Sequence, residues 1–411
     1  MNQLRLVLLL GWCGACGAVA SDPGLDPPVV NTAPGPEYAD EARDMNMVIG
    51  CDRTAGGRIW AAWVSGGDSE LGYFVAATSD DDGATWSKPR LVIAPTKTTD
   101  GLPRRALVGN FWTDPTGRLW LFFDQSVGYF DGRAGVWAIT CDNPEAPKPV
   151  WSVPRRIWHG ATLNKPTVLK NGEWLLPVSL WGRGCIHAST EKQRPTIDRA
   201  IIPPSFHEQF HELDDQRMAH LFVSTDKGRT WTRRGGVLFP KSNFDEHMVV
   251  ELRDGRLWML ARTSDGIAES HSSDKGRTWT EPKIRFPHVS ARFHLRRLAS
   301  GRLLLVKHGR IDERTKGRSH LTAMLSSDDG VTWQGGLVLD ERSGVSYPDG
   351  FQAPDGMIHI IYDYRRYADA EILMAKFREE DILAGGFQSP GAQARMLVNK
   401  ARGGTGKTPS K

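Results

Sequence analysis

The segment SFHEQFHEL at residues 205–213 is a match to a chemical motif defined by spacing. His207, Glu208 and His211 fit His-Glu-x-x-His, in which two imidazoles on one helix face bind zinc and the glutamate acts as a base in hydrolysis. That chemistry needs a sustained helix and a third ligand, and the motif instead follows two prolines in a short segment. The carboxylates nearby are Glu212, Asp214 and Asp215. A zinc-dependent hydrolase therefore stays an alternative, and we expect a short helix beside a pocket mouth and no bound metal.

Aspartates also recur in four copies of one octapeptide, Ser-x-Asp-x-Gly-x-Thr-Trp. The copies are SDDDGATW (79–86), STDKGRTW (224–231), SSDKGRTW (272–279) and SSDDGVTW (326–333). The Asp and Ser/Thr side chains can bind backbone N–H groups of a tight turn, Gly supplies a conformation that other residues resist, and Trp packs between strands. Because four equivalent turns cannot all face one site, we expect these aspartates to stabilise hairpins.

A second repeat indicates what positions these turns: a small or polar residue, a glycine and an apolar run typical of a strand. Its copies are GGRIWAAW (56–63), TGRLWLFF (116–123), NGEWLLPV (171–178), DGRLWMLA (254–261), SGRLLLVK (300–307) and DGMIHIIY (355–362). Their spacing suits one four-stranded antiparallel unit per copy, apart from one longer interval. The sequence therefore predicts an all-β fold, a six-bladed β-propeller with an insertion at about 182–217.

The ends of the propeller follow from the same pattern. The second blade carries a degenerate octapeptide, TCDNPEAPKPVW (140–151), and the last blade carries none. We expect the strand around Asn46 to Gly50 to close that last blade. The propeller then spans 44–385, between a linker at 21–43 and a solvated tail at 386–411.

Residues 1–20 have the features of a cleaved signal peptide: Arg5, a short apolar run and a small-residue cleavage site ending at Ala20. We expect an exported protein, periplasmic or extracellular, with no membrane span. Cleavage would leave Cys51, Cys141 and Cys185 as buried thiols or with at most one bridge. The 52 basic and 48 acidic residues form no dense basic stripe, which argues against a nucleic-acid partner.

The octapeptides resemble the Asp boxes of sialidases and of the wider bacterial neuraminidase repeat families, which share the six-bladed ring. The resemblance implies an exo-glycoside hydrolase that removes a terminal, acidic sugar from a glycan or glycoconjugate, without a cofactor. In NFDEHMVVELRDGRLWMLART (243–263) it maps Glu246 and Arg262 onto functional positions, and in GRSHLTAMLSSDDGVTW (317–333) it maps Arg318.

Two further segments complete the implied site. In RSGVSYPDGFQAPDGMIHIIYD (342–363), Tyr347 stands where those enzymes place a nucleophilic tyrosine. In WVSGGDSELGYF (63–74), Asp68 lies where they place the acid, with Glu70 in reserve. A phenol approaches an anomeric centre that bears a carboxylate without like-charge repulsion, and Glu246 would be its base. Arg262 and Arg318 would bind the substrate carboxylate.

The chain departs from the family pattern at the first arginine, because it contains no Arg-Ile-Pro motif. Arg43 is the expected substitute, a few residues early. Other arginines that might supply the charge are Arg105, Arg183 and Arg297. Asp349 also follows Tyr347 closely and is a candidate second carboxylate. The departure leaves a uronic acid, a keto-sugar acid or a neutral sugar open as the substrate.

The alternative from another class is a non-catalytic carbohydrate-binding propeller, which would explain the missing arginine as lost activity. Geometry distinguishes the two. Convergence of Tyr347, Glu246, Arg262 and Arg318 at the central mouth, with the phenol within hydrogen-bond reach of the glutamate, favours an enzyme.

Overall fold

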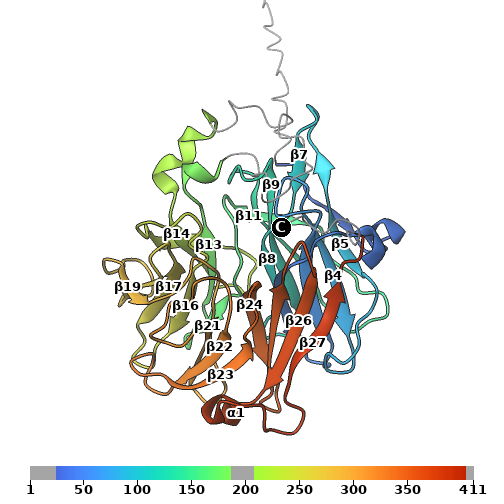
Figure 1. Cartoon of the computed structure of the whole chain (residues 1–411). Helices are drawn as coiled ribbons and strands as arrows, with labels where there is room; N and C mark the ends of the chain where they lie inside the picture. Colours follow the sequence, from blue (N-terminus) through green and yellow to red (C-terminus); the bar gives the residue numbers. More distant parts are fainter. Residues whose placement is uncertain (1–24, 187–207, 404–411) are drawn as a thin grey trace, which may run out of the picture.

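The computed structural model describes residues 25–186 and 208–403, which form six antiparallel sheets arranged as the blades of a ring (Figure 1). The predicted six-bladed β-propeller is confirmed. Within each blade the strands pair in chain order, and the first strands of neighbouring blades contact one another around the axis. The first strands all run in one direction along the axis, so their starts gather at one end of the ring and their ends at the other.

The strand bounds divide into six blades. The first three blades contain β2 (Met47–Arg53), β3 (Ile59–Ser65), β4 (Tyr73–Ser79) and β5 (Leu91–Ala94); β8 (Gly109–Thr113), β9 (Leu119–Val127), β10 (Gly135–Cys141) and β11 (Arg155–Trp158); and β12 (Thr167–Val168), β13 (Trp174–Ser179), β14 (Ala219–Ser224) and β15 (Thr232–Val237). The last three contain β16 (Met248–Glu251), β17 (Leu257–Arg262), β18 (Ile267–Ser272) and β19 (Lys283–Phe286); β20 (His294–Arg297), β21 (Leu303–His308), β22 (Leu321–Ser326) and β23 (Gln334–Asp340); and β24 (Val345–Gln352), β25 (Ile358–Tyr364), β26 (Glu371–Phe377) and β27 (Gln393–Lys400).

A few short elements lie outside this pattern. They are β1 (Val29–Asn31), β6 (Thr96–Lys97), β7 (Pro103–Arg105), the 3-10 turns η2 (Pro36–Tyr38), η3 (Asp40–Ala42), η4 (Arg183–Cys185) and η7 (His211–Gln216), and the helix α1 (Glu379–Ala384). The turns η4 and η7 belong to the predicted insertion between β13 and β14. None of the described helices is long and apolar enough to cross a membrane. The predicted signal peptide lies outside the described residues.

Three predictions about the ends of the propeller were wrong. The segment expected to be a solvated tail contains β27, which pairs with β26 and completes the last blade. The strand that starts at Met47 is the inner strand of the first blade and does not close the last one. The expected linker contains β1, which pairs with β5 and adds a fifth strand to the first blade. Each blade is thus built from one continuous segment of the chain.

The octapeptides form the hairpin turns between the third and fourth strands of four blades. In the copy at 272–279, the Asp274 carboxylate accepts hydrogen bonds from the backbone N–H of Thr278 at 2.9 Å and from its hydroxyl at 2.6 Å. Ser272 Oγ accepts the N–H of Gly276 at 2.7 Å, and the same bonds recur in the other three copies. The aspartates therefore stabilise turns at the rim opposite the insertion, as predicted.

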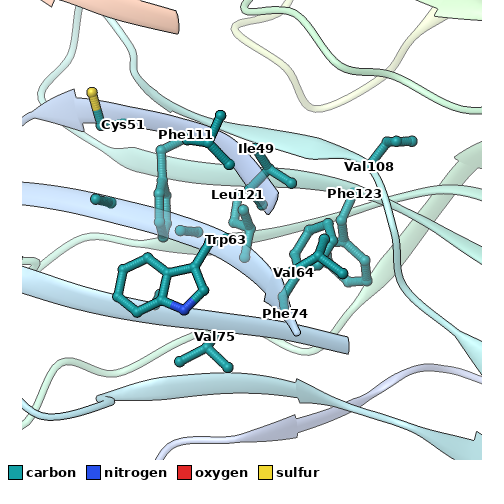
Figure 2. Packing of buried hydrophobic residues seen from close by; sticks show 14 of the residues in the cluster. Ile49, Cys51, Trp63, Val64, Phe74, Val75, Val108, Phe111, Leu121 and Phe123 are labelled. Atoms are coloured by element: carbon teal, nitrogen blue, oxygen red, sulfur yellow. The ribbon is translucent and has the colours of Figure 1, made fainter. Parts of the chain in front are cut away.

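Apolar packing between neighbouring blades supplies the core. All seven residues of β3 are buried, because its sheet packs between the second and sixth blades and neither face meets solvent. Figure 2 shows Ile49, Trp63 and Phe74 of the first blade packing toward Phe111 and Phe123 of the second. Cys51, Cys141 and Cys185 are buried free thiols, as expected.

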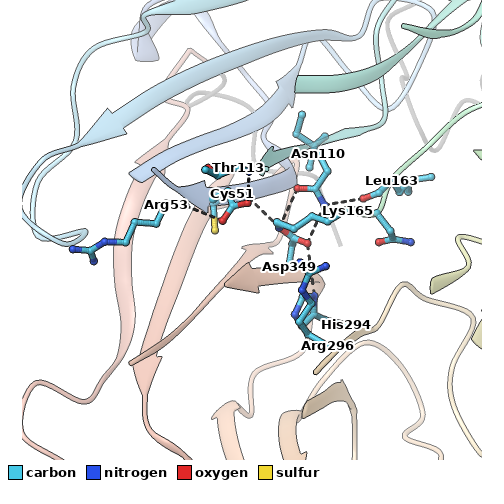
Figure 3. A network of polar contacts seen from close by, with 12 residues as sticks. Cys51, Arg53, Asn110, Thr113, Leu163, Lys165, His294, Arg296 and Asp349 are labelled. Atoms are coloured by element: carbon cyan, nitrogen blue, oxygen red, sulfur yellow. Dashed lines mark hydrogen bonds and ion pairs between the residues drawn. The ribbon is translucent and has the colours of Figure 1, made fainter. Parts of the chain in front are cut away.

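A polar network occupies the axis between the inner strands (Figure 3). The buried Asp349 carboxylate pairs with Lys165, accepts a hydrogen bond from Asn110 at 2.9 Å and lies 3.3 Å from the Arg292 guanidinium. It also accepts the backbone N–H of Cys51 at 3.1 Å. Burial by itself raises the pKa of Asp349, but the positive charges of Lys165 and Arg292 lower it to about 2.

Asp349→Asn should lower the free energy of unfolding by about 3–5 kcal/mol at neutral pH, because it leaves buried cations without a counter-ion. The native carboxyl has the lower pKa, so this stabilisation is present above the unfolded value of about 4 and is lost as pH falls toward about 2. Urea unfolding of both proteins at several pH values measures it. The exposed Asp142→Asn is the control, and a constant difference down to low pH would contradict the argument.

Candidate active site

A pocket of about 330 Å³ lies at the end of the ring where the inner strands begin, and every blade contributes to it. Its lining residues are Met47, Asp68, Leu107, Val108, Tyr129, Trp181, Phe244, Glu246, Arg262, Arg318, Tyr347 and Arg366. Five of the six residues predicted for the site are in this set. The ring closes around residues far apart in the sequence, so only the complete propeller forms the pocket.

Tyr347 and Glu246 are in direct contact at the bottom of this pocket. The Tyr347 hydroxyl donates a hydrogen bond to Glu246 Oε1 at 2.7 Å, and both side chains are buried. Burial raises the pKa of Tyr347, and the Glu246 carboxylate raises it further. The phenol is therefore neutral near pH 7 and has an acceptor in place for its proton, which is the arrangement of a nucleophile with its base.

The backbone at this pair is strained. Glu246 has a φ of 41° and Tyr347 a φ of 53°, in the left-handed region that side chains other than glycine rarely adopt. Glu246 Oε2 is buried and has no hydrogen-bond partner among the described residues. Strain and an unsatisfied buried oxygen at the same pair are costs that folds retain at functional sites.

Arg262 and Arg318 lie beside the pair. Arg262 Nη1 donates to Glu246 Oε1 at 2.9 Å and to the Tyr347 hydroxyl at 3.4 Å. Burial by itself would lower the pKa of Arg262, but Glu246 raises it above its ordinary value. Arg318 donates to Ser346 Oγ at 2.8 Å, and no carboxylate of the described residues pairs with it. Arg318 therefore has a free charge for an anionic ligand.

Arg366 is a third arginine in the pocket, and no sequence motif indicated it. It lies in the loop between β25 and β26, where its Nε donates to Asp363 at 3.1 Å and its guanidinium lies over the Tyr347 ring at 4.3 Å from the centroid. Burial by itself would lower its pKa, and Asp363 raises it above the ordinary value. The tandem Arg365-Arg366 in the hairpin that follows the last glycine repeat was the available signal.

Arg43, the expected substitute, does not line the pocket. It is 1% exposed, pairs with Asp40 and donates to Asn46 Oδ1 at 2.6 Å and to Ser65 Oγ at 3.1 Å, so it braces the first blade. The other arginines considered are also held elsewhere. Arg105 pairs with Asp124, Arg183 with Asp214, and Arg297 with Asp329. Asp349 lies in the axial network and not in the pocket.

Asp68 lies in the loop between β3 and β4 with its side chain 23% exposed. Its carboxylate is 3.5 Å from Arg366 Nη1 and accepts a hydrogen bond from the Tyr129 hydroxyl at 3.4 Å. Glu70, the reserve candidate, is buried and does not line the pocket. Asp68 is thus a partly exposed carboxyl group of the pocket, beside Arg366.

The segment that suggested zinc does not form a metal site in the part of the chain described. His207 lies outside the described residues, and the described ones contain no group of three or more His, Cys, Asp or Glu suited to a metal ion. His211 is exposed and contacts Asp214 at 2.8 Å in η7, which is a six-residue 3-10 turn and not a sustained helix. Asp214 pairs instead with Arg217 and Arg183.

The family model described as BNR repeat-like domain matches residues 57–360, which is most of the chain. The chain belongs to this family. A curated relative, a sialidase of Bacteroides fragilis strain YCH46, is 25% identical over 317 residues, 69% of this chain. The BNR repeat-like chain spans 53% of the length of that relative.

Solved structures support the fold of this BNR repeat-like domain. The intramolecular trans-sialidase from Ruminococcus gnavus, in complex with oseltamivir carboxylate, matches with a TM-score of 0.59 at 14% identity, over 86% of this chain and 98% of that one. A leech intramolecular trans-sialidase matches with a TM-score of 0.60 at 13% identity, over 85% and 70%. A Dyadobacter fermentans protein of unknown function matches with a TM-score of 0.58 at 17% identity, over 84% and 96%.

The Glu246→Gln variant of this BNR repeat-like domain should have a lower Tyr347 pKa than the wild type. The substitution removes a neighbouring negative charge that raises the tyrosine's pKa. Tyrosinate absorbance after a rapid pH jump, taken as the difference between each protein and its Tyr347→Phe counterpart, isolates this one phenol. An unchanged or higher pKa in Glu246→Gln would mean that the two groups do not interact as described.

Proposed function

We propose that this protein is an exo-acting glycoside hydrolase that releases a terminal sialic acid from glycoconjugates. The observation that carries the proposal is the 2.7 Å hydrogen bond from the Tyr347 hydroxyl to Glu246, in a pocket that also contains three guanidinium groups. A neutral phenol with an adjacent base suits attack on an anomeric carbon that carries a carboxylate. The non-catalytic alternative gives no reason to bury and strain this pair.

In the first step, Glu246 accepts the phenolic proton while Tyr347 oxygen bonds to the anomeric carbon. The bond from that carbon to the leaving oxygen breaks, and the Asp68 carboxyl donates a proton to this oxygen. In the second step, Asp68 accepts a proton from a water that attacks the same carbon. The Tyr347–carbon bond then breaks, and Glu246 returns the proton to the phenol.

The three arginines would bind the substrate carboxylate. Arg318 has no carboxylate partner among the described residues, whereas Arg262 pairs with Glu246, and Arg366 pairs with Asp363 and Asp68. Charge-assisted bonds from a rigid guanidinium fix both position and orientation. On this proposal Arg366 provides the charge that the family pattern places on the first blade.

The apolar half of the pocket supports a sugar with a substituent opposite its carboxylate. Met47, Leu107, Val108 and Trp181 come from the first three blades, whereas the arginines come from the last three. A sialic acid carries its carboxylate and its N-acyl group on opposite sides of the ring. The names of the relatives agree with this substrate class. We also propose that the enzyme is exported, because residues 1–20 fit a signal peptide.

The purified protein should release sugar from an aryl α-sialoside, and Tyr347→Phe should lower kcat/KM at least about a thousand-fold, the scale for loss of a nucleophile. Tyr364→Phe, outside the pocket at the end of β25, is the matched control. Chromatography of the product distinguishes free sugar from an anhydro sugar. No release by the folded wild type from the sialoside would overturn the proposed substrate.

Arg366→Met should lower kcat/KM by roughly ten- to one-hundred-fold, because it removes charge-assisted hydrogen bonds to the substrate carboxylate. Arg366→Lys should recover part of the loss. The neighbouring Arg365→Met is the control, since its side chain is 52% exposed and pairs with Asp369. Equal effects of Arg365→Met and Arg366→Met would show that Arg366 does not bind the substrate.

A further inference from the structure

A second cavity lies at the opposite end of the axis, where the inner strands end. It has a volume of about 490 Å³, within the range of small-molecule sites, and we call it the distal mouth. Its lining includes Asp52 at the end of β2, Trp112 and Thr113 at the end of β8, Arg296 at the end of β20, and Lys165. The distal mouth shares no lining residue with the catalytic pocket, and Figure 3 shows Arg296 beside the axial network around Asp349.

Arg296 is the centre of the distal mouth. It also lines two further cavities, of about 260 and 20 Å³, and residues from the inner-strand regions of all six blades line one or more of these three cavities. Its one hydrogen bond among the described residues runs from Nη1 to the Pro166 carbonyl oxygen at 3.2 Å. The other N–H donors of this rigid, planar cation have no partner among the described residues.

The neighbouring Arg297, in the same strand, differs from Arg296 because its guanidinium is held by several protein groups. It pairs with Asp329 at 2.9 Å and donates to the carbonyl oxygens of Glu251 and Gly301 at 2.8 Å each. No carboxylate among the described residues lies within ion-pair distance of Arg296. Burial lowers the pKa of Arg296, and Asp52 offsets part of this effect. A buried guanidinium without a counter-ion is stabilised when a ligand supplies an anion.

The groups around Arg296 suit a sugar more than a bare anion. Asp52 accepts backbone N–H groups of Arg53 at 2.9 Å and Thr113 at 2.8 Å, and its carboxylate oxygens retain capacity for further donors such as sugar hydroxyls. Thr113 Oγ1 is buried without a hydrogen-bond partner among the described residues. Trp112 also lines the cavity, but it is 2% exposed and its indole packs against Trp174, so the polar groups and not an aromatic face favour a sugar.

We propose that the distal mouth is a second, non-catalytic site that binds a sugar acid, with its carboxylate on the Arg296 guanidinium and its hydroxyls toward Asp52 and Thr113. Such a site would hold an acidic glycan on the face opposite the catalytic pocket, and two sites on one molecule raise the effective affinity for a branched or crowded glycan. It does not depend on the reaction proposed for the other end.

The test uses glucuronate as the probe, with glucose as its neutral counterpart and inorganic sulfate as the bare anion. The Arg318→Met protein is used to weaken carboxylate binding at the catalytic pocket, and the further loss on adding Arg296→Met measures the distal mouth. Calorimetry should detect glucuronate binding, at least roughly ten-fold weaker glucose binding, and at least a ten-fold loss of glucuronate affinity on adding Arg296→Met. Arg256→Met, an exposed arginine outside the distal mouth, is the matched control.

Unchanged glucuronate affinity in the Arg296→Met protein would overturn the proposal, as would absence of binding to the Arg318→Met protein. Sulfate that binds as tightly as glucuronate would overturn the assignment to a sugar. If Arg296→Met does not fold, as judged by its thermal unfolding, Arg296→Gln replaces it. A crystal of the wild type soaked in glucuronate should then show the sugar at the distal mouth, and an empty distal mouth would contradict the proposal.

Discussion

The ring and its site depend on the bonds that the buried Asp349 carboxylate makes. It belongs to the sixth blade and bonds to Lys165 of the third, Asn110 of the second, Arg292 of the fifth and the backbone of the first at Cys51. The fourth blade joins through Asn164, which donates to the carbonyl oxygens of Glu246 and His247 at 2.9 Å each. The Asp349 carboxylate thus bonds directly to four other blades, and Arg292 and Asn164 extend the network to the fourth blade.

This network also fixes the Tyr347–Glu246 pair from the axial side. Tyr347 lies two residues before Asp349 in β24, so the bonds that hold Asp349 limit where the phenol can lie. Asn164 holds the Glu246 carbonyl oxygen, and Arg292 donates to Asn164 Oδ1 at 3.1 Å. Both positive φ angles of the pair are therefore maintained by buried bonds on the axial side. Such support is needed because unsupported residues would relax to an extended backbone.

The sequence predicted the elements that repeat, which are the hairpin turns and the strands that follow a glycine. It missed β27 and Arg366, which belong to no repeat. The octapeptides and the glycine repeats mark turns whose hydrogen bonds are local, so pattern alone identified the blades. The strand β27 was missed because QARMLVNK alternates exposed and partly buried residues at the outer edge of a blade and follows no repeated turn. The roles of Tyr347, Glu246 and Arg318 came from a resemblance to a family, and their contact depends on ring closure, which no local pattern encodes.

The position of Arg366 follows from that closure. A ring has no end blade, so the sixth blade lies beside the first as closely as any consecutive pair. The loop that carries Arg366 meets the loop that carries Asp68, with 3.5 Å between Arg366 Nη1 and the Asp68 carboxylate, and the Tyr367 hydroxyl accepts the Asp68 N–H at 3.0 Å. An arginine on the first blade or on the sixth blade can therefore reach the same part of the pocket. A search along the sequence near the first blade cannot find it, because its neighbour in space is near the other end of the chain.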